Sequence, residues 1–531
     1  MILSMDFKEL VAACESAFAR NDLRALAVAL DALQLRWPPD PAMQLGELAT
    51  LAGLFIDAGA ALRLQIVVQR GQQILADNWD RLEPSYGSAQ LNYNTGNAYK
   101  ALYDIERVDA GWRFSIASAV LVLKAKASYW RALSEAKPEK ITPEQLTNLG
   151  NALDACGRVI DALHYYDRAL SVDARFGMAQ VNRGLALLYL NRVSGSYSIK
   201  LMHEIYRSLL AGATADSTEP HARAEAKRHA ELVAQAIRGH GHNPEEDQHS
   251  VRQDEEERAR HDPYWQWCLK HSLALSEHSL YCQCVGARRD DLSIMTPGGR
   301  LSGADVPNME LLLNRIKSEY CLSRALLFQS AADGGSLKWN VGPFEGTFTD
   351  LFDDEVTGIE PELLRTSFRL CFGILDRIAR GICGFLTLAT DRENLYFDSF
   401  WRAGGRDNTR WDTLSTLSDP SIVALYSLAG DLNERAGGEW SRLKRYRNLF
   451  EHELCLVRYD STSRDVPPWM AQTKFASISE GQLRSDAMDM LRFTRSAIFY
   501  FTFFIRSKSR ESDERREAVV VTFPKKPIGK E

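Results

Sequence analysis

The chain has 531 residues, of which 45% are hydrophobic and 25% are charged, and these proportions exclude a largely disordered protein. Its length predicts about three folded units. The formal net charge of −6 weighs against a protein that coats nucleic acid through overall positive charge, so any nucleic-acid site has to be local.

Targeting and metal-binding patterns are weak. The first residues, MILSMDFKEL, lack the basic and apolar regions of a secretory signal, and the longest apolar run, 497–505, is too short to cross a bilayer. Nine cysteines lack the spacing of a disulfide framework, and the closest pair, Cys282 and Cys284, lacks the two-residue gap of a zinc knuckle. We expect a soluble cytoplasmic protein with reduced thiols, no metal, no cofactor and no membrane partner.

Residues 1–211 are expected to form pairs of antiparallel helices. The clearest pattern lies at 142–191, where Gly150 in one helix and Tyr166 in the next have the spacing of a helical repeat. Small residues let the paired helices approach closely, and the aromatic ring fills the space between pairs. Gly184 follows Gly150 by one repeat length. The other positions of the pattern are Leu149, Leu153, Ala162 and Ala169.

An interrupted copy of the pattern precedes this segment. Gly96 and Tyr99 open it, and Ala125, Tyr129 and Ala132 close it. The pattern resembles the tetratricopeptide repeat (TPR), which implies a concave surface for a protein or peptide partner. The alternative is a set of generic amphipathic helices rich in Ala and Leu. Residues 1–80 fit poorly and are read as divergent repeats or a cap.

A charged linker is predicted at 212–262, because HGHNPEEDQHSVRQDEEERARHD contains almost no large apolar side chain. Five histidines fall within 220–249, but their irregular spacing favours a solvated linker over a metal site.

A mixed, mostly helical connecting region is predicted at 263–362. It includes a helix at 307–331, a Gly-rich loop at 297–303 and a strand or loop at 337–348. Its PGG and GGS turns lack the following Gly-Lys-Ser or Gly-Lys-Thr of a phosphate-binding loop, so we interpret them as ordinary turns.

Residues 363–507 are expected to form a four-helix bundle, followed by a charged tail at 508–531. Aromatic residues of the last helix are assigned to core or dimer packing in preference to stacking on RNA bases. The four predicted helices are 363–388, 421–436, 439–459 and 481–508.

The third predicted helix carries an outward-facing histidine. On a helical wheel its apolar residues cluster within about ±40° of one direction, and His452 points about 160° away from it. Asn448, Lys444 and Arg445 share that polar side. A solvated surface histidine and a functional one are equally supported by the residues alone. The apolar face comprises Leu443, Tyr446, Phe450, Leu454 and Val457.

The segment Arg447–His452, RNLFEH, resembles the signature of the HEPN superfamily, an Arg, a polar residue and a His near the start of the third helix of a four-helix bundle. The flanking segments ILDRIA, FDSFWR and ALYSLAGDL resemble a HEPN branch fused behind TPR-like helices. The fold class is therefore predicted as all-α, a TPR-like helical-hairpin solenoid followed by a C-terminal four-helix HEPN bundle.

The resemblance implies metal-independent RNA cleavage by attack of a ribose 2′-hydroxyl on the adjacent phosphate. His452 would act as general base or general acid, and Arg447 would hold the scissile phosphate. Asn448 would orient His452 or contact phosphate, and Glu451 would orient Arg447, with a surface hydrogen bond or ion pair as the alternative for each. Further RNA contacts are assigned to the neighbouring basic residues Lys444 and Arg445.

A homodimer is also predicted. Residues five apart lie about 140° apart on a helix, too far for Arg447 and His452 of one chain to face one phosphate easily. A two-fold dimer would gather two copies of each in one cleft, as the HEPN resemblance also implies. The leading hypothesis is an endoribonuclease regulated through its TPR-like repeats, a toxin or anti-phage effector. The alternative is a non-catalytic scaffold that binds RNA, nucleotide or a protein partner.

Overall fold

A computed structural model describes residues 6–513, apart from 36, 38, 42, 110–113, 196–197, 247–255, 257–258, 296–304, 331–355, 357, 389–394, 403–408, 435–436 and 461–475. Over these residues the protein is helical with one two-stranded sheet, which confirms the all-α fold class. The chain divides into two compact units. The first is 1–182 with the short pieces 215–217 and 416–418, and the second is the remainder.

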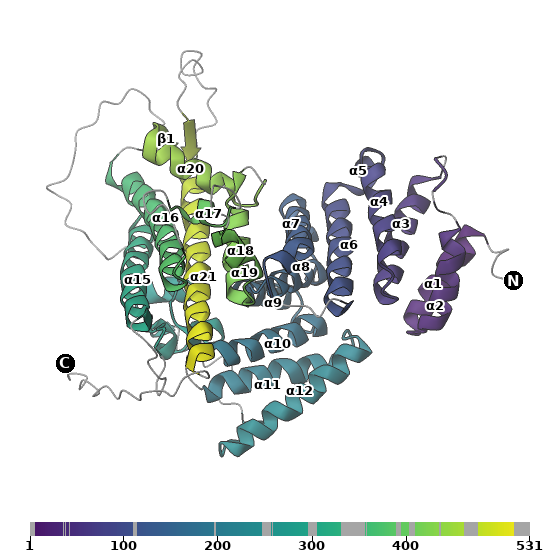
Figure 1. Ribbon diagram of the computed structural model, residues 1–531, viewed down its shortest axis with the longest axis horizontal. Helices are drawn as coiled ribbons and strands as arrows, with labels where there is room; N and C mark the ends of the chain where they lie inside the picture. The colour runs from purple at the N-terminus through teal and green to yellow at the C-terminus, as the bar shows by residue number, and fades with distance from the viewer. Residues whose placement is uncertain are drawn as a thin grey trace, which may run out of the picture. The chain divides into compact units, whose positions relative to one another are not determined.

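The first unit is built from successive helical pairs. Helix α1 packs on α2, α3 on α4, α6 on α7 and α8 on α9 (Figure 1). The bounds are α1 Phe7–Ala19, α2 Leu23–Gln34, α3 Leu45–Ala61, α4 Gln65–Asp77, α5 Trp79–Tyr86, α6 Ser88–Asp109, η2 Ala117–Ala119, α7 Val120–Glu135, η3 Pro138–Lys140, α8 Pro143–Ala155 and α9 Val159–Val172.

The small and aromatic residues of the repeat pattern meet inside these pairs. A Cβ on Gly150 would lie 2.5 Å from Cε1 of Tyr166, and one on Gly96 would lie 2.6 Å from Cδ1 of Tyr129. Both rings are buried, so only glycine leaves room for them. The Tyr166 hydroxyl donates to Asn151 Oδ1 at 3.0 Å, which satisfies its polar end. The predicted spacing therefore reports real helix contacts.

The second unit holds the remaining elements, and α10 (Gly177–Val193) crosses the division at residue 182. Within the described residues, every helix of either unit is too short or too polar to span a bilayer. The bounds are α11 Ile199–Thr214, α12 Pro220–Gly239, α14 Pro263–Lys270, η4 Glu277–Leu280, η5 Val285–Arg288, α15 Asp305–Gln329, α16 Ile359–Phe385, α17 Phe397–Phe400, α18 Thr409–Thr416, α19 Pro420–Asp431, α20 Ser441–His452, β1 Cys455–Arg458, β2 Ala476–Ser479 and α21 Glu480–Asp513.

Helix α12 corrects the expectation of a solvated linker for part of 212–262. It packs on α11 through a buried stripe of small residues. Alanines spaced one turn apart supply this stripe among many charged residues, so charge density concealed an amphipathic helix. The buried residues are Ala222, Ala226, Ala230, Val233, Ala234 and Ile237.

The connecting region predicted at 263–362 is described only in part. The helix predicted at 307–331 is α15. The predicted loop at 297–303 and the predicted strand or loop at 337–348 both lie wholly outside the described residues. The boundaries predicted at 211, 262, 362 and 507 stay predictions.

Helix α21 is the central element of the C-terminal bundle. It packs on α15 and α16 on one side and on α19 on the other (Figure 1). All six aromatic residues of its predicted set are buried within the chain, which confirms core packing over RNA stacking. They are Phe493, Phe499, Tyr500, Phe501, Phe503 and Phe504.

Candidate functional site

The helix that carries the RNLFEH segment is shorter than predicted. Helix α20 ends at His452, and the extended backbone of Glu453 leads into β1, which pairs in parallel with β2. The apolar run from Cys455 to Val457 favours this buried strand. The helical-wheel prediction of a core-facing side was therefore wrong beyond His452. Leu454 is 52% exposed, and Val457 is buried as part of strand β1 and not of a helix. The motif lies in the last two turns of the helix and not near its start.

One face of α20 is fixed against the bundle. Leu443 is buried, and the ring of Phe450 meets that of Phe368 on α16 edge to face at 5.6 Å between centroids. Near the helix start, Arg442 forms a 3.0 Å ion pair with the buried Asp486 on α21. These contacts fix both the first and the last turns of α20 against the bundle. The fold therefore also sets the direction of the opposite, polar face of the helix.

Arg447 is held between two aromatic rings. Its guanidinium carbon lies 5.7 Å from the centroid of Phe372 and 5.6 Å from that of Tyr396. Burial raises the pKa of the nearby Asp376 carboxyl, whereas the Phe397 N–H and the charge of Arg447 lower it. Cation–π contacts and a neighbouring carboxylate restrict the guanidinium without using all five of its donors.

These partners of Arg447 were missed in the sequence. Asp376 lies within ILDRIA, Phe372 lies two residues before that segment, and Tyr396 directly precedes FDSFWR. Those segments supported a resemblance but gave no residue a role. No spacing rule connects residues of α16 with residues of α20, since their proximity depends on how the two helices pack.

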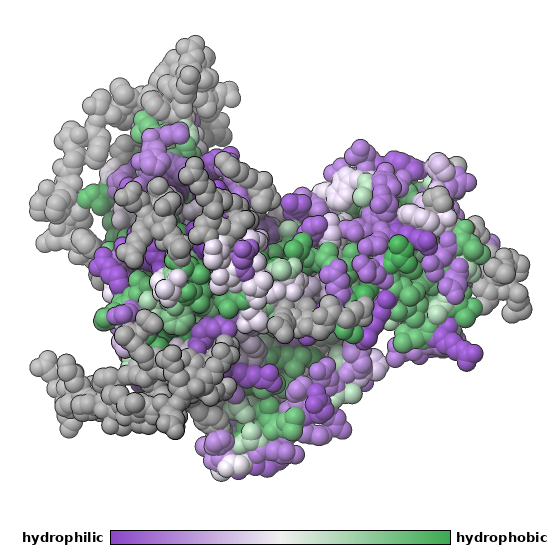
Figure 2. Space-filling view, viewed as in Figure 1, coloured by the Kyte–Doolittle hydropathy of each residue, from purple (hydrophilic) through white to green (hydrophobic). Residues whose placement is uncertain are grey.

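The other predicted site residues lie on the solvent side of α20. His452, Asn448 and Glu451 are exposed. Among the described residues, neither predicted contact is present: Glu451 does not pair with Arg447, and Asn448 does not bond to His452. Figure 2 shows mainly hydrophilic residues over this helix, near the top of the view.

The two basic residues assigned to RNA contacts have different surroundings. Lys444 pairs with Asp398, a carboxylate that also binds Arg402 at 2.6 Å. Its charge is therefore largely compensated within the chain. Arg445 is exposed, with its guanidinium carbon 5.8 Å from the centroid of Tyr446. Arg445 is the better placed of the two to meet a phosphate.

The arrangement supplies a positioned cation and an accessible imidazole on one short helix. An imidazole can donate or accept a proton near neutral pH, and a guanidinium can bind two phosphate oxygens at once. The helical positions of Arg447 and His452 differ by about 140° around the axis. Arg447 turns toward α16 and α17, whereas His452 is exposed at the helix end.

The comparison with known families agrees with this part of the chain. Residues 301–508 match the model of the LA2681-like HEPN family. The match supports a HEPN-superfamily domain and, with it, a nuclease-type or RNA-related function. It begins at residue 301, upstream of the predicted bundle, and so takes in α15 as well as α16 to α20 and most of α21. No curated protein matches the chain.

Proposed function

We propose that this protein is a metal-independent endoribonuclease of HEPN type with Arg447 and His452 as its catalytic residues. The observation that carries the proposal is the placement of RNLFEH on the end of α20, within the residues that match the HEPN family. Arg447 is held by its neighbours, and His452 is exposed to solvent.

Arg447 is assigned to the scissile phosphate. Its planar fork would bind two non-bridging oxygens and offset the charge that develops on the pentacoordinate phosphorus. The rings of Phe372 and Tyr396 limit the orientations available to the guanidinium, which lowers the entropy lost on binding phosphate. Asp376 would act as a positioning residue by attracting the guanidinium toward α16.

His452 is assigned to proton transfer. The ribose 2′-oxygen attacks phosphorus and loses its proton to a base, while the bond from phosphorus to the 5′-oxygen breaks and that oxygen gains a proton from an acid. The products are a 2′,3′-cyclic phosphate and a 5′-hydroxyl. A histidine serves either step, and its exposure at the end of α20 lets it reach an RNA strand.

The complete site is assigned to a homodimer. Because Arg447 and His452 diverge around one helix, a second copy of α20 related by a two-fold axis would place His452 of one chain near Arg447 of the other. Asn448 and Glu451 lie on the exposed face that such an interface would use.

The first unit is assigned to regulation or targeting. Its successive helical pairs resemble a TPR array, whose concave surface would take a protein or peptide partner. Within a cytoplasm, control of an RNA-cleaving domain by such a unit fits a toxin or an anti-phage effector.

The test is cleavage of a structured RNA by the full-length protein in EDTA. We expect the parent to produce 2′,3′-cyclic phosphate ends and Arg447→Ala and His452→Ala each to lower the rate by about a hundredfold or more. Matched controls are Arg315→Ala and His221→Ala, whose side chains are 67% and 76% exposed on other helices. These two variants should retain the parent rate.

Two results would contradict the proposal. Cleavage that is lost in EDTA and restored by a divalent ion would place the chemistry on a metal. If the parent binds RNA but does not cleave it with any candidate activator, the result would support the alternative of a non-catalytic scaffold.

A further inference from the structure

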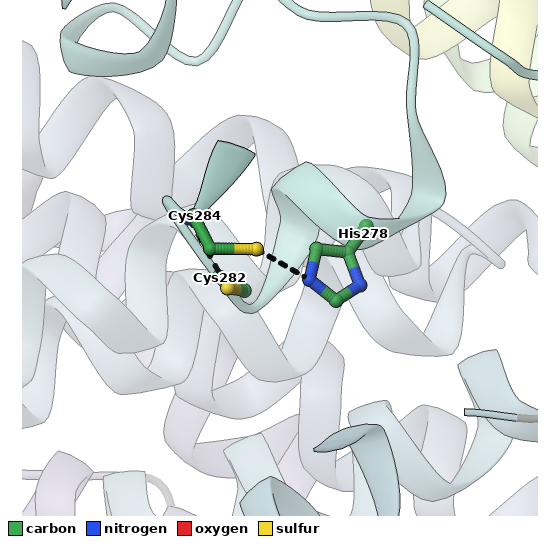
Figure 3. Close-up of side chains that lie close together, drawn as sticks. All are labelled: His278, Cys282 and Cys284. Carbon is green, nitrogen blue, oxygen red and sulfur yellow. Dashed lines mark hydrogen bonds between the residues drawn. The ribbon is translucent and has the colours of Figure 1, made fainter. Parts of the chain in front are cut away.

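Three metal-ligating side chains meet in the second unit, away from α20. His278 lies in η4, and Cys282 and Cys284 lie in the short segment that leads into η5. The possible ligand atoms, one nitrogen and two sulfurs, all lie within 4.8 Å of one another (Figure 3). His278 Nε2 is 3.0 Å from Cys284 Sγ. Cys282 is buried, and the other two residues are partly exposed.

The neighbours of His278 leave its Nε2 free to bind a metal. The hydroxyl of Tyr281 donates to Ser198 Oγ at 2.9 Å and lies 2.9 Å from His278 Nδ1. Since the hydroxyl proton is used toward Ser198, the tyrosine oxygen accepts from Nδ1–H. The lone pair of the neutral ring is then on Nε2, which faces the sulfurs. Metal-binding histidines are commonly oriented by such a bond from the other ring nitrogen.

The sulfur environment also suits bound thiolates. The backbone N–H of Cys284 donates to Cys282 Sγ at 3.3 Å, and the buried Lys200 ammonium donates to the same sulfur. These donors would stabilise negative charge on a metal-bound thiolate. Among the residues that the structure describes, the cluster consists of one imidazole nitrogen and two sulfurs without a carboxylate, so its donors are comparatively soft.

The spacing of the ligand atoms is close to that of a tetrahedral zinc site. With Zn–S near 2.3 Å and Zn–N near 2.0 Å, neighbouring ligands in such a site lie about 3.6–3.8 Å apart. Movements of roughly 1 Å or less would convert the observed cluster to this geometry.

We propose that His278 Nε2, Cys282 Sγ and Cys284 Sγ bind one Zn²⁺, with a solvent molecule as the fourth ligand. The partial exposure of His278 and Cys284 allows solvent to reach that position.

The ion would fasten an irregular part of the chain to the bundle. Glu277, next to a ligand, pairs with the buried Arg506 of α21 and accepts the Gly195 N–H at 3.1 Å. Together with Lys200 and Ser198, these contacts connect the cluster to the segment before α11, to α11 and to α21. Zinc at this point would stabilise the segment that contains η4 and η5.

The test begins with the full-length protein, purified under reducing conditions and freed of metal by a chelator. Titration with Co²⁺ should saturate at one ion per chain, with a near-ultraviolet thiolate-to-cobalt band and the intense visible bands of tetrahedral Co²⁺. Zn²⁺ should abolish these bands and slow backbone hydrogen exchange in η4 and η5. These readouts require no variant, so they do not depend on whether a substituted chain folds.

Substitutions then locate the ion. Cys282→Ser and Cys284→Ser should reduce the charge-transfer band by at least half and weaken binding by about tenfold or more. The matched control Cys321→Ser, at a partly exposed thiol outside the cluster, should leave both unchanged. A reduced parent without the cobalt bands would overturn the proposal. So would unchanged bands in Cys284→Ser, or a native Cys282–Cys284 disulfide found by mass spectrometry.

Discussion

Mixing two inactive variants should restore cleavage if the proposed site is shared between chains. Arg447 and His452 lie on one helix, about 140° apart around its axis and about 7.5 Å apart along it. Arg447 turns toward Phe372 and Tyr396, whereas His452 is exposed. We therefore expect each working site to combine Arg447 of one chain with His452 of the other.

The magnitude follows from counting sites. A heterodimer of Arg447→Ala and His452→Ala has one site with both residues intact and one with neither. If equal amounts exchange freely, half of the dimers are heterodimers, so the mixture should recover about a quarter of the parent rate. The assay is RNA cleavage after co-refolding or co-expression, with the heterodimer fraction measured by native mass spectrometry.

The controls decide the interpretation. Each variant alone, treated in the same way, should stay at its own low rate. A mixture that contains heterodimers yet cleaves no faster than the two variants separately would refute the shared site, and both residues would then have to act from one chain.

Three further predictions concern stability and can be followed by urea unfolding together with hydrogen exchange of the affected helices. Gly150→Ala should lower the free energy of unfolding by about 1–3 kcal/mol, because the added Cβ would lie 2.5 Å from Cε1 of Tyr166. The control Gly53→Ala, whose Cβ would have no atom within 4 Å, should raise the free energy of unfolding by about 0.5–1 kcal/mol. Equal effects of the two substitutions would contradict the packing argument. Arg324→Met should lower the free energy of unfolding by about 3–5 kcal/mol, because Arg324 binds the carboxylate of Asp290 at 2.5 Å and the substitution leaves that carboxylate without its ion-pair partner. An unchanged free energy of unfolding would show that this ion pair is dispensable. Burial raises the pKa of Asp154 from 3.8 to about 6, so ionisation of this carboxyl lowers the free energy of unfolding as the pH rises through that interval. Asp154→Asn should lack this fall and stabilise the first unit by up to about 3 kcal/mol at pH 7, the equivalent of about two pKa units.

The repeat pattern could be predicted because its contacts are local in sequence. Gly150 and Tyr166 belong to adjacent helices joined by a short turn, so the spacing that lets them meet can be read directly. Gly96 on α6 and Tyr129 on α7 are farther apart in the sequence, but they belong to a copy of the same pattern. The buried aromatics of α21 were also predictable, since so many large apolar side chains on one helix require a core.

Features that depend on packing between distant segments were not predictable. Helical periodicity continued past His452, but the buried environment of Cys455–Val457 favoured a strand paired with β2. The environment of Arg447 depends on α16 and on the segment before α17. His278 joins the two cysteines through a loop whose course no periodicity describes.

The packing of α20 also explains why its proposed chemistry requires a second chain. Leu443 and Phe450 occupy one side of the helix, and Arg442 and Lys444 are paired with carboxylates of α21 and α17. The aromatic residues of α21 are already used inside the bundle and leave none of that set to stack on RNA. What α20 presents outward is therefore a narrow polar face that ends at His452. Within one chain the guanidinium of Arg447 lies about 140° around the helix from His452, so we expect the Arg447 of a second chain, related by a two-fold axis, to be the one that meets this imidazole.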